Sequence, residues 1–349
     1  MSAPANPPSS EAETLVRIGT RRSALALRQT DLVMAALRAA HANLTFEVSA
    51  MATAGDRDTT TPLPALGKGL WTSELEARLA SKDVDVVVHS LKDMPTTLPD
   101  GCELACVTQR EDPRDVLVMS KKHAAKGWTG LADLPRGSVV GTSSVRRAAQ
   151  LRRRYPDLVF KDVRGNIETR LNKCDAEGEA EAGYDAIILA AAGLLRLGYG
   201  ERIAQYLDSK TPGGGLLHAV GQGALGLEIR AGDERMRALL KAVEDTPTML
   251  ACFAERSVMR TLEGGCSVPI GVETEWLEEG KLRLRVVVVS LDGSRAVEDE
   301  ATSDVSTLAE AEAMGRELAL KMAKNGAQEI LDEINQGRTS GAALKVGDA

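Results

Sequence analysis

The feature that most constrains this chain is a pattern that occurs twice, at residues 16–40 and 138–155. The first copy reads VRIGTRRSALALRQTDLVMAALRAA and the second reads SVVGTSSVRRAAQLRRRY. In each copy, β-branched residues precede a Gly-Thr turn and apolar residues at helical spacing follow it, which predicts a buried strand, a turn and a helix. The repetition favours two similar α/β domains that face each other. A chance likeness of two turns is the alternative.

Further apolar segments extend this pattern along the chain. Five runs read as buried strands that alternate with helical segments: residues 46–53, 83–90, 103–108, 115–120 and 184–191. Continuous apolar runs of this kind indicate largely parallel sheets with helices on both faces. The Gly-rich stretch 208–230 ends in a strand-like run that would return the chain to the first domain.

From about residue 235 the pattern changes to that of an α+β domain. Two helical segments come first, residues 281–293 begin with strand alternation, and residues 307–336 have the pattern of one long amphipathic helix. The expected division is a disordered tail at 1–13, domain 1 at 14–113 and 217–234, domain 2 at 114–216, domain 3 at 235–338, and a tail at 339–349.

Composition and charge exclude several classes of protein. A net charge of −7 argues against nucleic acid or an anionic membrane as the main partner, and an aromatic content of 3% argues against a platform of stacked aromatic rings. The sequence contains no run of about 18 apolar residues, so no transmembrane helix is predicted. The polar, Pro/Ala/Ser-rich N-terminus lacks the apolar stretch of a signal peptide, so we expect a cytoplasmic protein.

Basic residues concentrate in turns that contain Gly, Ser and Thr. Any single surface arginine is normally solvated, but the set indicates a polyanionic ligand, because arginine grips carboxylates through two parallel hydrogen bonds. GxxxxGK[ST] does not occur, which argues against a nucleotide bound in a P-loop. The set comprises Arg21, Arg22, Lys68, Lys92, Arg146, Arg147, Arg164, Arg170 and Arg196.

Two sites have residues suited to chemistry. Ser90, Lys92 and Asp93 come directly after an apolar strand, where ligands bind in open α/β sheets. Asp93 is therefore a candidate for stabilising a developing cation or moving a proton, and a turn cap is the equal alternative. The preceding His89 has the position of a structural histidine.

Cys266 follows two glycines in LEGGCSVPIG, where a thiol is available for covalent attachment. A small buried apolar residue is the alternative for it, as for the other cysteines. The number of cysteines, five, is odd, and no pair has C-x-x-C spacing, so both a disulfide framework and a zinc site are disfavoured.

The chain resembles the porphobilinogen deaminase family in the order and spacing of nine motifs that span nearly its whole length. The motifs are RIGTRRSALALRQ, GKGLWTSELE, VVVHSLKDMPT, REDPRDVLV, GTSSVRRAAQL, VRGNIETRL, AAAGLLRLG, HAVGQGALGLEIR and LEGGCSVPIG. The LWTSELE segment, with Trp71, is most similar to fungal members. The resemblance implies two domains of the type II periplasmic binding-protein fold, a cleft between them, and a smaller α+β domain that carries a cofactor cysteine.

The resemblance also implies roles for single residues. Cys266 would hold a dipyrromethane cofactor through a thioether, and Asp93 would be catalytic. The other cofactor-binding residues implied are Ser90, Lys92, Asp93, Thr142, Ser144, Arg146, Arg147, Arg164 and Arg170. The substrate-binding residues implied are Arg21, Ser23, Gln29, Lys68 and Arg196. Many bacterial members have a second lysine shortly before GKG, but Lys68 is the only lysine in this loop.

The implied activity is the stepwise condensation of four porphobilinogens by a cytoplasmic monomer, without metal, nucleic acid or membrane. Each pyrrole bears an acetate and a propionate, which accounts for the many arginines. Two other classes remain open. A non-catalytic anion-binding module would explain the two α/β domains but not the domain with Cys266. A ligand-sensing regulator would need a helix-turn-helix with a basic face, and none is found in the sequence.

Overall fold

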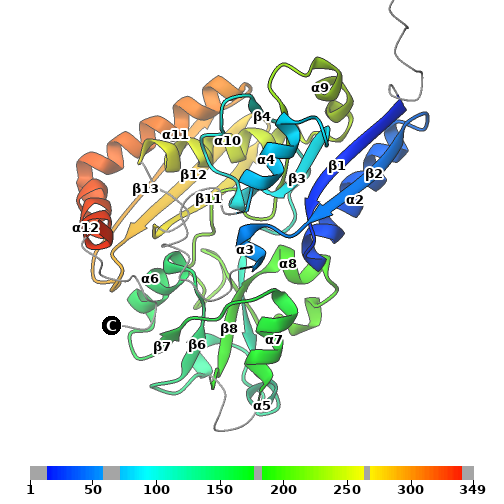
Figure 1. Ribbon diagram of the computed structural model, residues 1–349. Coiled ribbons are helices and arrows are strands. Elements are labelled where there is room, and N and C mark those ends of the chain that lie inside the picture. The colour runs from blue at the N-terminus through cyan, green and yellow to red at the C-terminus, as the bar shows by residue number, and fades with distance from the viewer. Residues whose placement is uncertain (1–13, 58–70, 177–182, 263–267, 340–349) are drawn as a thin grey trace, which may run out of the picture.

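The computed structural model describes residues 14–57, 71–176, 183–262 and 268–339. These residues form three separate β-sheets. Figure 1 shows the first in blue to cyan apart from its yellow-green strand β10, the second mainly in green, and the third in yellow to orange. Lys68 and Cys266 lie outside the described residues, as do the N-terminal tail and the end of the C-terminal tail. None of the described helices is long and apolar enough to cross a bilayer.

The first sheet has five strands in the order β2-β1-β3-β10-β4. β1 pairs in parallel with β2 and β3, whereas β10 is antiparallel to both β3 and β4. Helices α2 and α4 cover opposite faces, because Val86 and Val88 pack with the core under α2 while Val87 packs with that under α4. The bounds are β1 Leu15–Arg21, α2 Ala24–Ala40, β2 Thr45–Met51, α3 Ala54–Arg57, α4 Ser73–Ala80, β3 Val86–Ser90, β4 Cys102–Val107 and β10 Leu225–Arg230.

The second sheet repeats this arrangement, with the order β7-β6-β8-β5-β9. β6 is parallel to β7 and β8, and β5 is antiparallel to β8 and β9. Helix α6 covers one face, and α7 and α8 cover the other. The bounds are β5 Asp115–Met119, α5 Lys121–Ala124, β6 Val139–Gly141, α6 Val145–Arg154, β7 Val159–Lys161, α7 Ile167–Asp175, β8 Ala186–Ala190, α8 Ala191–Arg196 and β9 Gln205–Leu207.

The two sheets confirm the fold class expected from the repeated pattern. The two copies form β1–α2 and β6–α6, and each strand is second in its sheet. The sheets are largely parallel, as expected, but one strand in each sheet is reversed. Both reversed strands, β5 and β10, come directly after the chain has crossed from the other sheet. An apolar run records burial but not strand direction, so the sequence pattern could not reveal the reversal.

The chain therefore crosses twice between the sheets, through residues 108–114 and 208–224. The first crossing follows β4 and leads into β5, and the second follows β9 and leads into β10. Both crossings run beside each other, because Glu111 N donates to Gly223 O at 3.2 Å. This pair of segments is where the two α/β sheets are joined.

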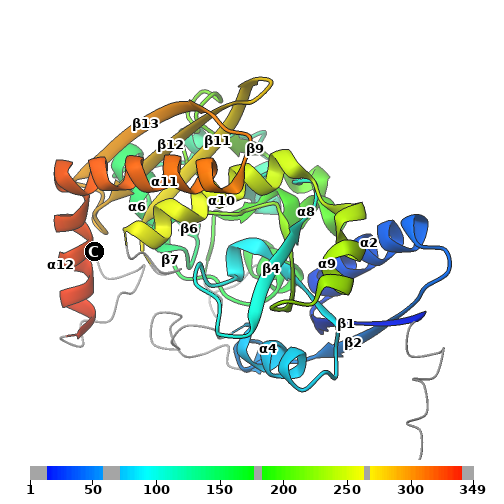
Figure 2. The same cartoon turned by 90° about the horizontal axis from the view of Figure 1, so that it is seen from above.

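The third sheet is antiparallel, with the order β11-β12-β13, and it confirms the α+β character of the C-terminal part. Helices α10 and α11 lie beside each other across one face (Figure 2), where Leu282, Leu284 and Val286 of β12 enter a shared core. The other face packs on Ala149 of α6 through Val287. The bounds are α9 Glu234–Leu240, α10 Thr246–Thr261, β11 Ile270–Glu278, β12 Lys281–Val289, β13 Ala296–Asp304, α11 Leu308–Met322 and α12 Gln328–Thr339.

The single long helix predicted for residues 307–336 is wrong in one respect. The helical path breaks at residues 323–327, where Gly326 has a left-handed φ of 101°. Glycine takes this conformation without the steric cost that a Cβ would add, so α11 and α12 are two helices that meet at an angle.

Candidate active site

A short turn after β3 presents the three polar residues that the sequence singles out. β3 ends at Ser90, and Leu91–Asp93 form a single 3₁₀ turn whose buried Leu91 donates its N–H to Ala224 O at 3.0 Å. Lys92 and Asp93 remain partly exposed at the carboxyl end of the strand. Gln29 of α2 donates to Ser90 Oγ at 2.9 Å, which joins two residues predicted separately.

The neighbouring His89 is buried and has a structural contact. Its Nε2 lies 2.8 Å from Glu228 Oε2 of β10, across the paired strands β3 and β10. This is the structural role that the sequence favours for His89.

The second copy of the repeated pattern supplies two buried arginines. Ser144 caps α6 by accepting from Arg147 N, and Thr142 lies buried in the turn before it. Arg146 and Arg147 are only 5% and 6% exposed, although both are charged. Burial of two cations requires an anionic partner nearby, because an isolated buried charge is strongly unfavourable.

That partner is Asp115, the first residue of β5, which the sequence analysis missed. Arg146 Nη1 donates to Asp115 Oδ2 at 2.7 Å, and Arg147 Nη2 donates to Asp115 Oδ1 at 2.6 Å. Burial alone would raise the pKa of Asp115, but the two guanidinium groups hold it well below its usual range. The sequence shows that an acidic residue opens an otherwise apolar strand, but it does not indicate which partners this residue has.

The turn before α7 places two more of the predicted arginines. Asn166 caps α7 by accepting from Thr169 N at 2.8 Å, and Arg170 Nε donates to Gly165 O at 2.7 Å. Gly165 has a φ of 115°, so the turn requires a glycine there. Arg164 is partly buried in the same turn.

These elements bring cations from both sheets into one cluster. Lys92 interacts electrostatically with Asp93, Asp115, Arg146 and Arg147, and Arg170 does so with Asp93, Arg147 and Arg164. Burial is the main reason why the pKa of Lys92 falls to about 8.

Burial likewise lowers the pKa of Arg170 to about 10. Among the described residues, the carboxylates that act on Lys92 and Arg170 are those of Asp93 and Asp115, and Arg146 and Arg147 share that of Asp115. The cluster therefore carries uncompensated positive charge, which fits a ligand with several carboxylates.

Three of the residues implied for substrate binding, Arg21, Ser23 and Gln29, belong to the first copy of the repeated pattern. Ser23 caps α2 by accepting from Ala26 N at 3.3 Å. Arg21 donates from Nε to Asp56 at 3.2 Å, and its guanidinium lies 4.2 Å from the centre of the Trp71 ring. Asp56 is not among the residues predicted from the sequence.

Arg196 is the last of the predicted site residues that the structure describes. Its Nη2 donates to Gly223 O at 2.7 Å, on the second crossing, so it links α8 to the join between the sheets. Its buried Nε has no hydrogen-bond partner in the described part of the chain. A buried donor without a partner is uncommon and is suited to an incoming acceptor.

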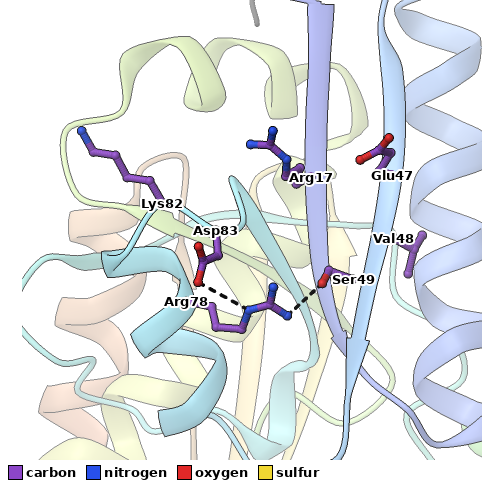
Figure 3. Close-up of a pocket in the computed structure, with 7 residues that line it drawn as sticks. All are labelled: Arg17, Glu47, Val48, Ser49, Arg78, Lys82 and Asp83. Carbon is purple, nitrogen blue, oxygen red and sulfur yellow. Dashed lines mark hydrogen bonds and ion pairs between the residues drawn. The ribbon is translucent and has the colours of Figure 1, made fainter.

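A surface depression lies at the opposite end of β3 from this cluster. It has a volume of about 480 Å³ and is lined by Arg17, Glu47, Val48, Ser49, Arg78, Lys82 and Asp83 (Figure 3). Arg78 spans it from Asp83 to Ser49. None of the predicted site residues lines it, so this depression is not the predicted site.

Comparison with known proteins identifies the family. Residues 16–238 match the family model described as porphobilinogen deaminase, dipyromethane cofactor binding domain, and residues 249–324 match its C-terminal domain. The porphobilinogen deaminase of Neurospora crassa is 65% identical over 97% of this chain and 99% of its own length. The chain belongs to the porphobilinogen deaminase family.

Other porphobilinogen deaminases show similar agreement. Those of Yarrowia lipolytica and Prochlorococcus marinus are 52% and 50% identical, each over 92% of this chain and 93% and 96% of their own lengths. Among solved structures, the effector-binding domain of BenM with benzoate has 14% identity and a TM-score of 0.37, over 66% of this chain and 90% of that one. This likeness is too low to support any inference.

As a porphobilinogen deaminase, the chain is a transferase of tetrapyrrole synthesis that uses a dipyrromethane cofactor. The model of the cofactor-binding domain covers both α/β sheets, and that of the C-terminal domain covers α10, the third sheet and α11. No group of three or more His, Cys, Asp or Glu side chains within the described ranges has the arrangement of a metal site.

Proposed function

We propose that this chain condenses four porphobilinogens, one at a time, onto a dipyrromethane bound to Cys266. Hydrolysis then releases linear hydroxymethylbilane, and four molecules of ammonia are lost in all. The observation that carries the proposal is the cluster of Lys92, Arg146, Arg147 and Arg170 around Asp93, which has more positive than negative charge. A growing chain of pyrroles is a polycarboxylate, and it would supply the missing negative charge.

Asp93 would stabilise positive charge during each addition. Loss of ammonia leaves the substrate pyrrole electron-deficient, and a carboxylate fixed beside its ring N–H lowers the energy of that state. The alternative, a turn cap, has little support from the structure, since the Asp93 carboxylate accepts no hydrogen bond from the described residues around it. When bound, the dipyrromethane supplies the terminal pyrrole ring to which the substrate is added.

The basic residues would divide into two groups. Arg146, Arg147 and Arg170, with Lys92 and Arg164, would seat the carboxylates of the cofactor, assisted by the hydroxyl groups of Ser90, Thr142 and Ser144. Arg21, Ser23, Gln29 and Arg196 would contact the incoming substrate. Arg21 and Arg196 donate to Asp56 and to Gly223 O rather than to Asp115, which supports this division. Lys68 would join the second group, although it lies outside the described residues.

The setting of the reaction is part of the proposal. The protein would act as a cytoplasmic monomer, without nucleic acid, in three domains with the boundaries predicted from the sequence. A non-catalytic anion-binding module is the rival class, and the family comparisons do not favour it. Intact mass separates the two classes, because only the enzyme carries a covalent group.

The deciding experiment is mass spectrometry of the unmodified wild-type chain. We expect its mass to exceed that of the sequence by one dipyrromethane, with the addition on the tryptic peptide of residues 261–281, which contains Cys266. The peptide of residues 242–256, which contains Cys252, serves as the internal control and should have its sequence mass. Full activity in protein whose Cys266 is unmodified would overturn the proposal.

Lys92 gives the reaction an expected dependence on pH. A carboxylate-binding role needs the protonated amine, and burial lowers the pKa of Lys92 to about 8, so activity should fall as the pH rises through and above 8. Carboxylates bound beside Lys92 would raise its pKa, so the fall in activity would shift to higher pH. The charged groups facing Lys92 are Asp93, Arg147, Asp115 and Arg146.

The check is the profile of kcat/KM against pH for the wild type and for Lys92→Arg. The ordinary pKa of arginine is at least about 2 above that of lysine, so the alkaline fall should move to higher pH in the variant. An identical alkaline limb in both proteins would show that another group controls it.

A further inference from the structure

One buried glutamine contacts groups from both α/β sheets, and the proposed mechanism does not use it. Gln222 is 1% exposed and lies in the turn that ends the second crossing. Its neighbours Gly221 and Gly223 have φ values of 69° and 90°, and a Cβ at Gly223 would lie 2.2 Å from Glu111 O. The turn is thus packed backbone against backbone on the first crossing, which fixes where the Gln222 side chain begins.

The amide of Gln222 fits its surroundings in one orientation only. Nε2 donates to Pro113 O at 2.7 Å and to Asp115 Oδ1 at 3.0 Å, while Oε1 accepts from Lys92 Nζ at 3.4 Å. A carbonyl and a carboxylate can only accept, and an ammonium can only donate, so a flipped amide would lose all three contacts. A glutamate of the same shape would keep the contact with Lys92 but lose both donors.

The backbone of the same residue reaches the C-terminal part of the chain. Gln222 O accepts from Arg110 Nε at 2.8 Å, and Arg110 donates twice to Glu255 of α10, at 2.7 and 3.0 Å. Glu255 also accepts from Gly221 N at 2.8 Å. Residues from the two α/β sheets and from the α10 helix therefore meet at one turn.

We propose that Gln222 is a positioning residue for this reaction: it keeps Lys92 of the first sheet and Asp115 of the second at a fixed separation. Asp115 orients Arg146 and Arg147, so Gln222 holds the cations of both sheets in register beside Asp93. This inference rests on the proposed function, because it assigns Gln222 a part in that same site.

The test compares Gln222→Met and Gln222→Glu with the matched control Gln150→Met. Gln150 is also a buried glutamine, 5% exposed, but within the described ranges its side chain exchanges hydrogen bonds only with the backbone of Leu217. The measurements are the melting temperature, the cofactor-bearing fraction from the intact mass, and kcat and KM for porphobilinogen per cofactor-bearing molecule. We expect both Gln222 variants to lose up to about 100-fold in kcat, since displacement by about 1 Å is that costly.

The control separates positioning from stability. Gln150→Met should lower the melting temperature while kcat per cofactor-bearing molecule stays within about twofold of wild type, a difference small on the scale of a positioning loss. Gln222→Glu should also move the alkaline fall in activity to higher pH, because a carboxylate beside Lys92 favours its charged form. Equal kcat in Gln222→Met and Gln150→Met would overturn the inference, as would an unmoved pH profile in Gln222→Glu. Either result leaves the proposed function intact if the wild type carries its cofactor.

Discussion

Replacing Asp93 by asparagine is expected to slow the reaction about 100- to 1000-fold, equivalent to about 3–4 kcal/mol. Asparagine keeps the size of the side chain but removes its charge. If the carboxylate stabilises a cation that exists only along the reaction path, the loss falls on kcat rather than on KM. Asp93→Glu keeps the charge but displaces it, so it should retain more activity than Asp93→Asn. The measurement is the single-turnover rate of protein shown by mass to carry the cofactor.

The same strand offers a matched control for this substitution. Asp83 precedes β3 at the end opposite Asp93 and lies on the surface depression, with a side chain that is 58% exposed. Asp83→Asn should leave the rate unchanged. A near-normal rate in Asp93→Asn, with a lowered melting temperature, would mean that Asp93 is structural.

The second large effect is expected at Asp115, and it concerns stability. Asp115→Asn would leave Arg146 and Arg147 buried without their anionic partner. Breaking a buried ion pair from one side costs about 3–5 kcal/mol, because the remaining charge is uncompensated. Denaturant unfolding of the variant should therefore begin at a clearly lower concentration than that of the wild type.

Asp133→Asn is the control for Asp115→Asn. Asp133 ends a short turn between β5 and β6, and among the described residues its carboxylate accepts only from Thr129 and Gly130. An asparagine can keep these contacts. Its unfolding curve should coincide with that of the wild type. A coincident curve for Asp115→Asn as well would show that the two arginines find other partners at no cost.

Most of the fold could be predicted from local patterns in the sequence. The two βα units, β3, β8 and the amphipathic helices all have periodicities that depend on near neighbours in the chain, and they form where expected. β13 was missed because AVEDEATSD has no apolar alternation, and it is a strand only through its pairing with β12. The break at Gly326 did have a local signal, the Asn-Gly pair in KNGA.

The candidate site, like the fold, could be predicted only in part. Asp93 and the arginines stand in turns that follow strands or open helices, so their positions could be read from the chain. The roles of Asp115 and Gln222 could not be predicted from the sequence, because they arise only when α6 and the second crossing bring distant partners to these residues. A buried acid at a strand start has no distinctive local pattern, and neither has a glutamine between two glycines.

The double crossing has a consequence for how this protein is made. Among the strands that the structure describes, β4 pairs only with β10, and β10 also pairs with β3. While a ribosome is still producing the second sheet, the edges of β3 and β4 have no partner, although both strands already exist. Unpaired edges invite association with other chains. Newly made chains are thus most in need of a chaperone between the synthesis of residue 107 and that of residue 230.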